Sequence, residues 1–271
     1  MTTVGELQRL AGEIAGCRRC PRLVAWREEV AETRRAAYRG EEYWGRPVPG
    51  FGDPDAGIVV VGLAPAAHGA NRTGRMFTGD RSGDWLYGSL HRIGLASQPH
   101  SVARDDGMEL RDVYITAPVR CAPPANRPTT AERDNCRPFL ERELELLGQW
   151  RVLVALGGFG FGVLAAHLGL RPRPRFGHGV EVPLGEGRWL MGCYHVSQQN
   201  TFTGKLTEPM LDWVFRRAVE LRHSPPGLST DGHIVVEQSR CVHGPRDEPL
   251  RPSPIRSVVG RHDPHLPVEE A

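Results

Sequence analysis

The sequence predicts an α/β fold, a three-layer α/β/α sandwich with a central four-stranded, mainly parallel sheet. Short apolar segments alternate along the chain with segments of helical periodicity, and this alternation is typical of a parallel sheet with helices on both faces. Long polar loops follow the apolar segments, as expected at the carboxyl ends of parallel strands, where ligands bind. The four strands are expected at residues 57–62, 112–119, 152–158 and 188–197.

Helices are expected between these strands and at both ends of the sheet-forming region. Apolar residues recur at helical spacing up to Gly16, which should end the first helix. Thr129 and Glu132 form the pattern of a capping box, and Thr207 is a suitable N-cap for the closing helix. Residues 21–56 are charged and interrupted by Pro and Gly, so no element is expected there. The expected helices are 4–15, 84–95, 129–150, 159–169 and 207–222.

The length and composition of the chain limit its organisation. With 271 residues, 39% of them hydrophobic, it can form one sizeable core or at most two small domains. We expect one domain over 1–223 and a Pro- and Arg-rich tail, 224–271, which lacks periodicity and should be disordered. No apolar segment approaches the ~20 residues that span a bilayer, and the amino terminus is unlike a signal peptide. A cytoplasmic protein is therefore expected, and the net charge of +2 is too small to prove a polyanionic partner.

Four of the six cysteines form a pattern that suggests a metal site. They are Cys17, Cys20, Cys121 and Cys136. Stable disulfides are rare in the cytoplasm, and four thiolates from two distant segments suit a cubane iron–sulfur cluster. A tetrahedral zinc site also fits, and the plainest alternative is four ordinary buried thiols. Cys193 lies in a predicted strand and Cys241 in the tail, so neither is expected to be a ligand.

Three polar loops leave the carboxyl ends of predicted strands and should converge on one crevice. They are residues 62–83, 117–129 and 195–207. A competing interpretation is a nucleotide-cofactor enzyme, because Gly160, Gly162 and Ala165 superficially match the dinucleotide fingerprint. That match is weak, because the motif follows the third strand rather than the first.

These loops contain three long motifs, GLAPAAHGANRTGRMFTGD at 62–80, VRCAPPANRPT at 119–129 and HVSQQNTFTGKLTEPML at 195–211. Together with the four cysteines, they resemble the uracil-DNA glycosylase superfamily, specifically its iron–sulfur branch, family 5 or UdgB type. The resemblance implies a structural [4Fe–4S] cluster held by Cys17, Cys20, Cys121 and Cys136. It also implies a monomeric, nucleoid-associated DNA glycosylase that flips a deaminated base into a pocket and leaves an abasic site for base excision repair.

The resemblance assigns catalytic roles to three residues. Asp80 should steer the attacking water and counter the positive charge that develops on the sugar. The alternative for Asp80 is a helix N-cap, although Ser82 or Asp84 could serve that purpose instead. His195 should donate a hydrogen bond to the base oxygen as the base leaves, and Asn126 is a weaker candidate for contact with water or base.

The same motifs suggest the residues that surround the base and the DNA. Phe77 should stack on the flipped base, and small residues should offer backbone N–H groups to it; these are Gly62, Ala64, Ala66 and Ala67. The expected DNA contacts are Arg72, Gln199, Asn200, Thr201 and Lys205.

The sequence departs from its uracil-restricted iron–sulfur relatives at two places in the pocket. No carboxylate occurs over residues 66–68, and Ala117 takes the place of an asparagine that reads uracil. These departures imply a looser pocket that also accepts hypoxanthine or xanthine. A Schiff base requires an amine, and Lys205, the only lysine, and the N-terminal amine are the only candidates, so a monofunctional mechanism is expected. The alternatives are a uracil-restricted iron–sulfur glycosylase and a non-catalytic, metal-stapled DNA-binding module.

Overall fold

The computed structural model describes residues 2–224, and the predicted tail from residue 225 onward lies outside the described residues. The helices are α1 (Thr3–Ala15), α2 (Pro21–Thr33), α3 (Ala70–Thr73), α4 (Arg81–Arg92), α5 (Thr130–Leu146), α6 (Gly158–His167), α7 (Gln198–Phe202) and α8 (Glu208–His223). The strands are β1 (Phe51–Gly52), β2 (Ile58–Val61), β3 (Val113–Thr116), β4 (Val152–Leu156), β5 (Glu181–Gly185) and β6 (Arg188–Cys193).

The strands form one mixed sheet in the order β1-β3-β2-β4-β6-β5. The four inner strands β3, β2, β4 and β6 are parallel and correspond to the four predicted strands. The predicted number of strands was nevertheless too low, because β1 and β5 add an antiparallel strand at each edge of the sheet. With only two residues in β1, and with Pro183 and Gly185 in β5, these edges lack the long apolar pattern of a buried strand.

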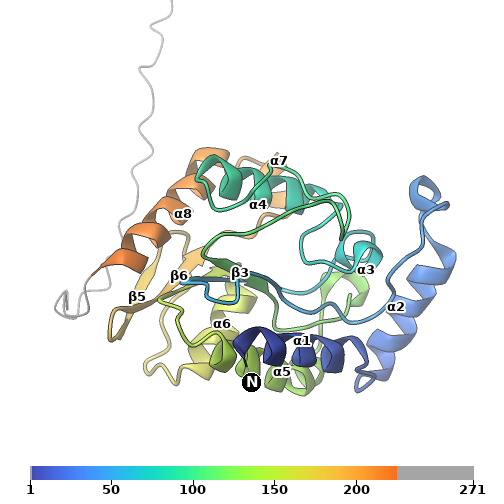
Figure 1. Ribbon diagram of the computed structural model, residues 1–271, viewed down its shortest axis with the longest axis horizontal. Helices are drawn as coiled ribbons and strands as arrows, with labels where there is room; N and C mark the ends of the chain where they lie inside the picture. Colours follow the sequence, from blue (N-terminus) through green and yellow to red (C-terminus); the bar gives the residue numbers. More distant parts are fainter. Residues whose placement is uncertain (1, 225–271) are drawn as a thin grey trace, which may run out of the picture. The chain divides into compact units, whose positions relative to one another are not determined.

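Helices cover both faces of the sheet, which confirms the three-layer α/β/α sandwich. Figure 1 shows α4 and α8 on one side and α1, α5 and α6 on the other. Side chains alternate between the two sides along each strand. In β2, Ile58 and Val60 pack with α4 and α8, whereas Val59 and Val61 pack with α5 and α6. All four are fully buried, which explains why β2 is apolar throughout.

The helix boundaries follow from capping residues that the sequence displays. The Thr129 hydroxyl accepts from the Glu132 backbone N–H, and the Glu132 carboxylate accepts from the Thr129 N–H, so the predicted capping box is confirmed. Thr207 caps α8 as predicted, and Gly16 ends α1. Helix α2 was not predicted, because its charged composition conceals a buried face that includes Leu23 and Arg27.

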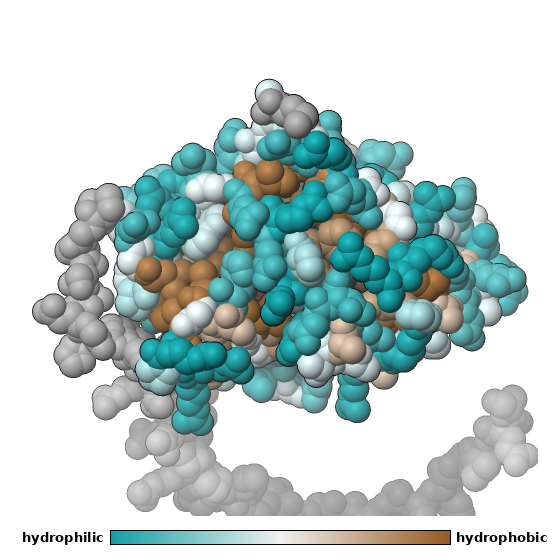
Figure 2. Space-filling model, turned by 90° about the horizontal axis from the view of Figure 1, so that it is seen from below, coloured by the Kyte–Doolittle hydropathy of each residue, from teal (hydrophilic) through white to brown (hydrophobic). Residues whose placement is uncertain are grey.

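The face of the molecule seen in Figure 2 carries hydrophobic residues in separate patches divided by hydrophilic side chains. Scattered apolar residues of this kind are ordinary on folded proteins. Over residues 2–224, none of the helices combines the length and apolarity needed to cross a membrane.

Candidate functional site

A cleft of about 660 Å³ lies at the carboxyl ends of β2, β3 and β6. The loops that follow these strands all contribute to its walls, so the predicted convergence of the three loops is confirmed. The side chains include small, aromatic, acidic and imidazole groups. The lining residues are Leu63, Ala64, Pro65, Ala66, Ala70, Met76, Phe77, Asp80, Arg81, Ser82, Ala117, Ala125, Asn126, Arg127, His195, Ser197, Gln198 and Gln199.

Asp80 lies where both of its predicted roles, catalysis and helix capping, would require it to be. Its side chain lines the cleft, and its Oδ1 atom also accepts a hydrogen bond of 3.0 Å from the Gly83 backbone N–H, which caps α4. The N-cap is therefore Asp80 itself and not Ser82 or Asp84. Oδ2 lies where a side chain at Gly69 would be, so only glycine fits there.

Burial raises the pKa of Asp80, while the helix N–H groups of Gly83 and Ser82 and the charge of Arg72 act against this rise. The carboxylate is thus desolvated yet held by fixed donors. An anion in this state interacts strongly with positive charge that develops nearby.

His195 is the second residue after β6 and lies on the wall of the cleft. Burial lowers the pKa of its imidazole to about 4, so the ring is neutral at physiological pH. Gly157, with φ +96°, leaves room for the ring, since a Cβ there would lie 3.3 Å from the His195 Cβ. The Asn200 side chain donates to the His195 carbonyl oxygen at 2.8 Å and fixes the backbone of the loop.

Phe77 lies on the cleft wall beside His195, with ring centroids 6.4 Å apart. Its φ of 53° places a bulky residue in the left-handed region, a strained conformation that is commonest at functional sites. Gly62 makes room for the ring, because a Cβ at that position would lie 2.9 Å from Phe77 Cζ. The backbone N–H of Gly62 already donates to Thr116 O at 2.9 Å, so the predicted role of Gly62 as a donor to the base is wrong.

Only some of the other small residues of the first motif lie on the wall of the cleft. Ala64 and Ala66 line the cleft, as does Ala117 from the loop after β3, whereas Ala67 is not among its lining residues. Asn126 is exposed at the rim with φ +55°, and its neighbour Ala125 has φ +52°. This pair of left-handed residues turns the chain so that both can reach the cleft.

Arg72 is buried inside the first loop, so the predicted DNA contact is wrong. Its guanidinium donates to the carbonyl oxygens of His68 at 2.8 Å and Gly79 at 2.8 Å, pairs with Glu41, and lies 4.0 Å from the Tyr38 ring centroid. Each of the three guanidinium nitrogen atoms therefore has a hydrogen-bond partner within the protein. Arg72 closes the loop that presents Asp80.

The remaining predicted DNA contacts have different surroundings. Gln199 is exposed and lines the cleft. The Asn200 amide donates to the His195 carbonyl oxygen, and the Thr201 hydroxyl donates to the Ser197 carbonyl oxygen at 3.3 Å, so both side chains are held within the loop. Lys205 is exposed, and its Nζ atom lies 4.9 Å from the Tyr194 ring centroid.

Sequence reasoning missed several residues at the mouth of the cleft. The Arg81 guanidinium lies 4.5 Å from the ring centroid of Phe202, which is 63% exposed. Ser82, Ser197 and Gln198 also contribute to the wall. The only signal for these residues is their adjacency to Asp80 and His195, because polar residues in loops have no periodicity.

The glycines that resembled a dinucleotide fingerprint have a packing role. A Cβ at Gly160 would lie 2.9 Å from the Gly62 carbonyl oxygen, so glycine allows α6 to approach β2 closely. Gly162 faces no neighbouring atom within 4 Å. The motif is thus explained by helix-on-sheet contact.

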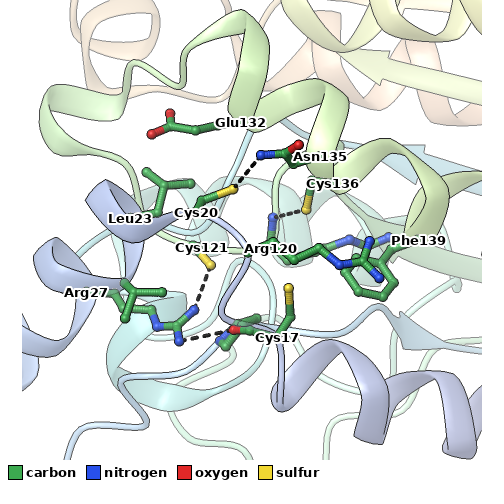
Figure 3. Close-up of a pocket in the computed structure, with 13 residues that line it drawn as sticks. Cys17, Cys20, Leu23, Arg27, Arg120, Cys121, Glu132, Asn135, Cys136 and Phe139 are labelled. Atoms are coloured by element: carbon green, nitrogen blue, oxygen red, sulfur yellow. Dashed lines mark hydrogen bonds between the residues drawn. The ribbon is translucent and has the colours of Figure 1, made fainter.

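A second cavity gathers the four predicted ligand cysteines (Figure 3). Cys17 and Cys20 come from the link between α1 and α2, Cys121 follows β3, and Cys136 belongs to α5. The fifth described cysteine, Cys193, is fully buried in the hydrophobic core, as predicted.

Hydrogen-bond donors point at three of these sulfur atoms. Arg27 Nη1 donates to Cys121 Sγ at 2.9 Å, the Arg120 backbone N–H to Cys136 Sγ at 3.3 Å, and Asn135 Nδ2 to Cys20 Sγ at 3.6 Å (Figure 3). Burial raises the pKa of Cys121 to about 11 and that of Cys136 to about 12, and the donors from Arg27 and Arg120 act against this rise.

Two buried arginines add positive charge to the same cavity. Both Arg27 and Arg120 line it, and the Nε–H of each is buried without a hydrogen-bond partner. The Arg120 guanidinium also forms a buried ion pair with Glu143. A negatively charged group with thiolate ligands fits this environment, because it would satisfy orphaned cationic donors. Within residues 2–224, no three His, Cys, Asp or Glu side chains are close enough together to hold a single metal ion.

Comparison with known proteins was consistent with the geometry of the cleft. The uracil DNA glycosylase superfamily matches residues 49–220 of the chain. A type-5 uracil-DNA glycosylase of Mycobacterium tuberculosis is 56% identical over 220 residues, which cover 80% of this chain and 82% of that protein.

Two further relatives carry the same description. The type-5 uracil-DNA glycosylase of Thermus thermophilus is 56% identical over 77% of this chain and 94% of its own length. That of Pyrobaculum aerophilum is 48% identical over 80% of this chain and 94% of its own length. Because the matches extend over most of each protein, the chain belongs to the uracil-DNA glycosylase superfamily and, within it, to the type-5 enzymes.

Proposed function

We propose that this DNA glycosylase releases uracil from DNA by hydrolysis of the N-glycosidic bond. The observation that carries the proposal is the shared cleft of Asp80 and His195, with Phe77 of the Asp80 loop beside the His195 ring. The relatives that match most of the chain are named uracil-DNA glycosylases. Since a base inside a duplex is inaccessible, the nucleotide must be extruded into this cleft.

The two residues stabilise opposite charges in the transition state. As the bond between C1′ and the base nitrogen breaks, its electron pair leaves with the base, and the sugar gains oxocarbenium character. The Asp80 carboxylate stabilises that cation and orients the water whose oxygen bonds to C1′. The neutral His195 imidazole donates a hydrogen bond to the base oxygen that gains negative charge. A proton released from the water then neutralises the base.

We expect the reaction to stop at the abasic site. The lysine amine available for a Schiff base, Lys205 Nζ, lies over the Tyr194 ring, and Lys205 is not among the residues that line the cleft. The test is a uracil-containing duplex incubated with the protein and analysed with and without alkali. Strand cleavage should require alkali, whereas a covalent adduct trapped by borohydride would contradict a monofunctional mechanism.

The same cleft supports a base range wider than uracil. Ala66 and Ala117 present only methyl groups to a space of about 660 Å³, so they impose little hydrogen-bond selection. Release of hypoxanthine and xanthine from matched duplexes is expected. Activity on uracil alone would favour the uracil-restricted alternative, and no release of any base would favour a non-catalytic DNA-binding module.

We also propose that Cys17, Cys20, Cys121 and Cys136 hold a structural [4Fe–4S] cluster. Support comes from the donors aimed at the sulfur atoms and the two orphaned arginine N–H groups. All four cysteines line the same cavity, as ligation of one cluster requires. When bound, the cluster supplies charge and cross-linking and takes no part in hydrolysis. Purified protein should be brown and contain iron and acid-labile sulfide; stoichiometric zinc would overturn the assignment.

A further inference from the structure

The segment between α6 and β5 carries a run of arginines and prolines that the cleft does not use. Arg171, Arg173 and Arg175 are all exposed and alternate with Pro172 and Pro174. Arg171 donates to the Leu170 carbonyl oxygen. For Arg173 and Arg175, no ion pair or hydrogen bond is found with any residue between 2 and 224. Their charges are therefore available to an external anion.

The alternation with proline makes this segment stiff. Proline fixes its own φ, and a residue before proline is restricted to extended conformations, so Arg173 has little freedom. In an extended chain the Cα atoms of alternate residues lie about 6–7 Å apart. That distance is close to the rise of two nucleotides along one DNA strand, roughly 3.4 Å each. A stiff segment also loses little conformational entropy on binding.

The end of this segment is anchored next to the cleft. Phe176 packs against Phe161 of α6, with ring centroids 5.5 Å apart. His178 Nδ1 accepts a hydrogen bond of 3.2 Å from the Tyr194 backbone N–H. Tyr194 immediately precedes His195, so the segment that carries the arginines ends close in space to the candidate catalytic histidine.

A third cation extends the positive charge across Tyr194. The Lys205 Nζ atom lies 4.9 Å from the Tyr194 ring centroid, and the His178 ring lies 5.0 Å from the same centroid. The nearest carboxylate of strand β5, that of Glu181, is already paired with Arg217. No described carboxylate thus compensates the arginines of this segment.

We propose that Arg173 and Arg175 form a phosphate-binding strap that, together with Lys205, holds the DNA backbone beside the extruded nucleotide. The strap contacts phosphate and not base edges, so it adds affinity without sequence preference. The inference rests on the proposed function only in that the ligand is DNA. It also explains how a chain of net charge +2 can present a local positive surface.

The test is the salt dependence of binding to a short, undamaged DNA duplex by the full chain. We measure the association constant at several salt concentrations and plot its logarithm against that of the salt concentration. In the double variant Arg173→Gln/Arg175→Gln, the steepness of this negative slope should decrease by about 2, and the affinity at low salt should decrease on the order of 10-fold. The charge-preserving variant Arg173→Lys/Arg175→Lys should keep the wild-type slope.

Arg111→Gln is the matched control. Arg111 is exposed just before β3, at the end of the sheet opposite the cleft, and its removal should leave the slope unchanged. An unchanged slope in the Arg173→Gln/Arg175→Gln variant would contradict the proposal that these arginines bind phosphate. Binding needs no catalysis, so a protein that shows the strap's salt dependence but releases no uracil would refute the proposed activity and leave the strap intact.

Discussion

At the residue scale, Asp80 has a structural role at the start of α4 and a proposed catalytic role in the cleft. Its Oδ1 atom caps α4, and its carboxyl group is buried in the wall of the cleft. Burial raises the pKa of Asp80, so its ionised form is less stable in the folded protein than in the unfolded chain. That part of the stability is present at low pH and is lost as the pH rises through the folded pKa. A desolvated carboxylate therefore costs stability at neutral pH, as is common at active sites.

The pH dependence of uracil release should follow from the two cleft residues. Asp80 must be ionised and has a raised pKa, while His195 must be neutral and has a pKa of about 4. Both conditions fail as the pH falls, so single-turnover release should decline on the acid side and should not decline as the pH rises towards neutrality. A fall in rate through about pH 6–7 as the pH rises would instead indicate an imidazolium acid and contradict a neutral histidine.

The residues predicted for the cleft differ in how well the sequence located them. Asp80, Phe77 and His195 lie beside strand ends, and the topology alone brings them together. Gly62 and Arg72 were assigned wrongly because the partner of a buried N–H group depends on long-range packing. Composition cannot distinguish an arginine that faces phosphate from one that holds carbonyl oxygens.

At the scale of elements, the Arg72 side chain holds the loop between β2 and α4 in its conformation. The guanidinium joins the carbonyl oxygen of His68, before α3, to that of Gly79, after it. Arg72→Gln would leave these groups unsatisfied, at a cost of about 2–3 kcal/mol. We expect a lower urea midpoint and a slower release step with little change in duplex affinity. A large loss of affinity at an unchanged midpoint would restore Arg72 as a DNA contact.

The elements that the sequence located are those with strong periodicity or capping signals. The four parallel strands and helices α1, α5 and α8 were predicted within a few residues. Helix α2 and strands β1 and β5 were not, because β1 and β5 form by pairing with neighbours and α2 hides its buried face among charges. Each of these three elements owes its stability to tertiary contacts rather than to local propensity.

For the whole molecule, the cysteine site joins the amino-terminal helices to the sheet. The hydrophobic contacts there are small clusters, one around Leu10 and Ile14 and another around Leu23 and Val119. A cluster bound by four cysteines would connect three parts of the chain: the segment between α1 and α2, helix α5, and the segment after β3.

Removal of one ligand should therefore weaken the whole fold. Cys136→Ser should lose iron and lower the melting temperature by several degrees, because metal binding is coupled to folding. The control is Cys193→Ala in the core, which should retain the full iron content despite a small cavity. Equal iron in Cys136→Ser and the wild type would remove Cys136 from the ligand set.

The most direct test of the central claim is the single-turnover rate of uracil release by Asp80→Asn, measured together with its melting temperature. Asparagine caps a helix about as well as aspartate, so the substitution preserves α4 and removes only the charge. The rate should fall by at least about 100-fold, and the melting temperature at neutral pH should be equal or higher. A rate close to that of the wild type would show that Asp80 is an N-cap alone and would contradict the account.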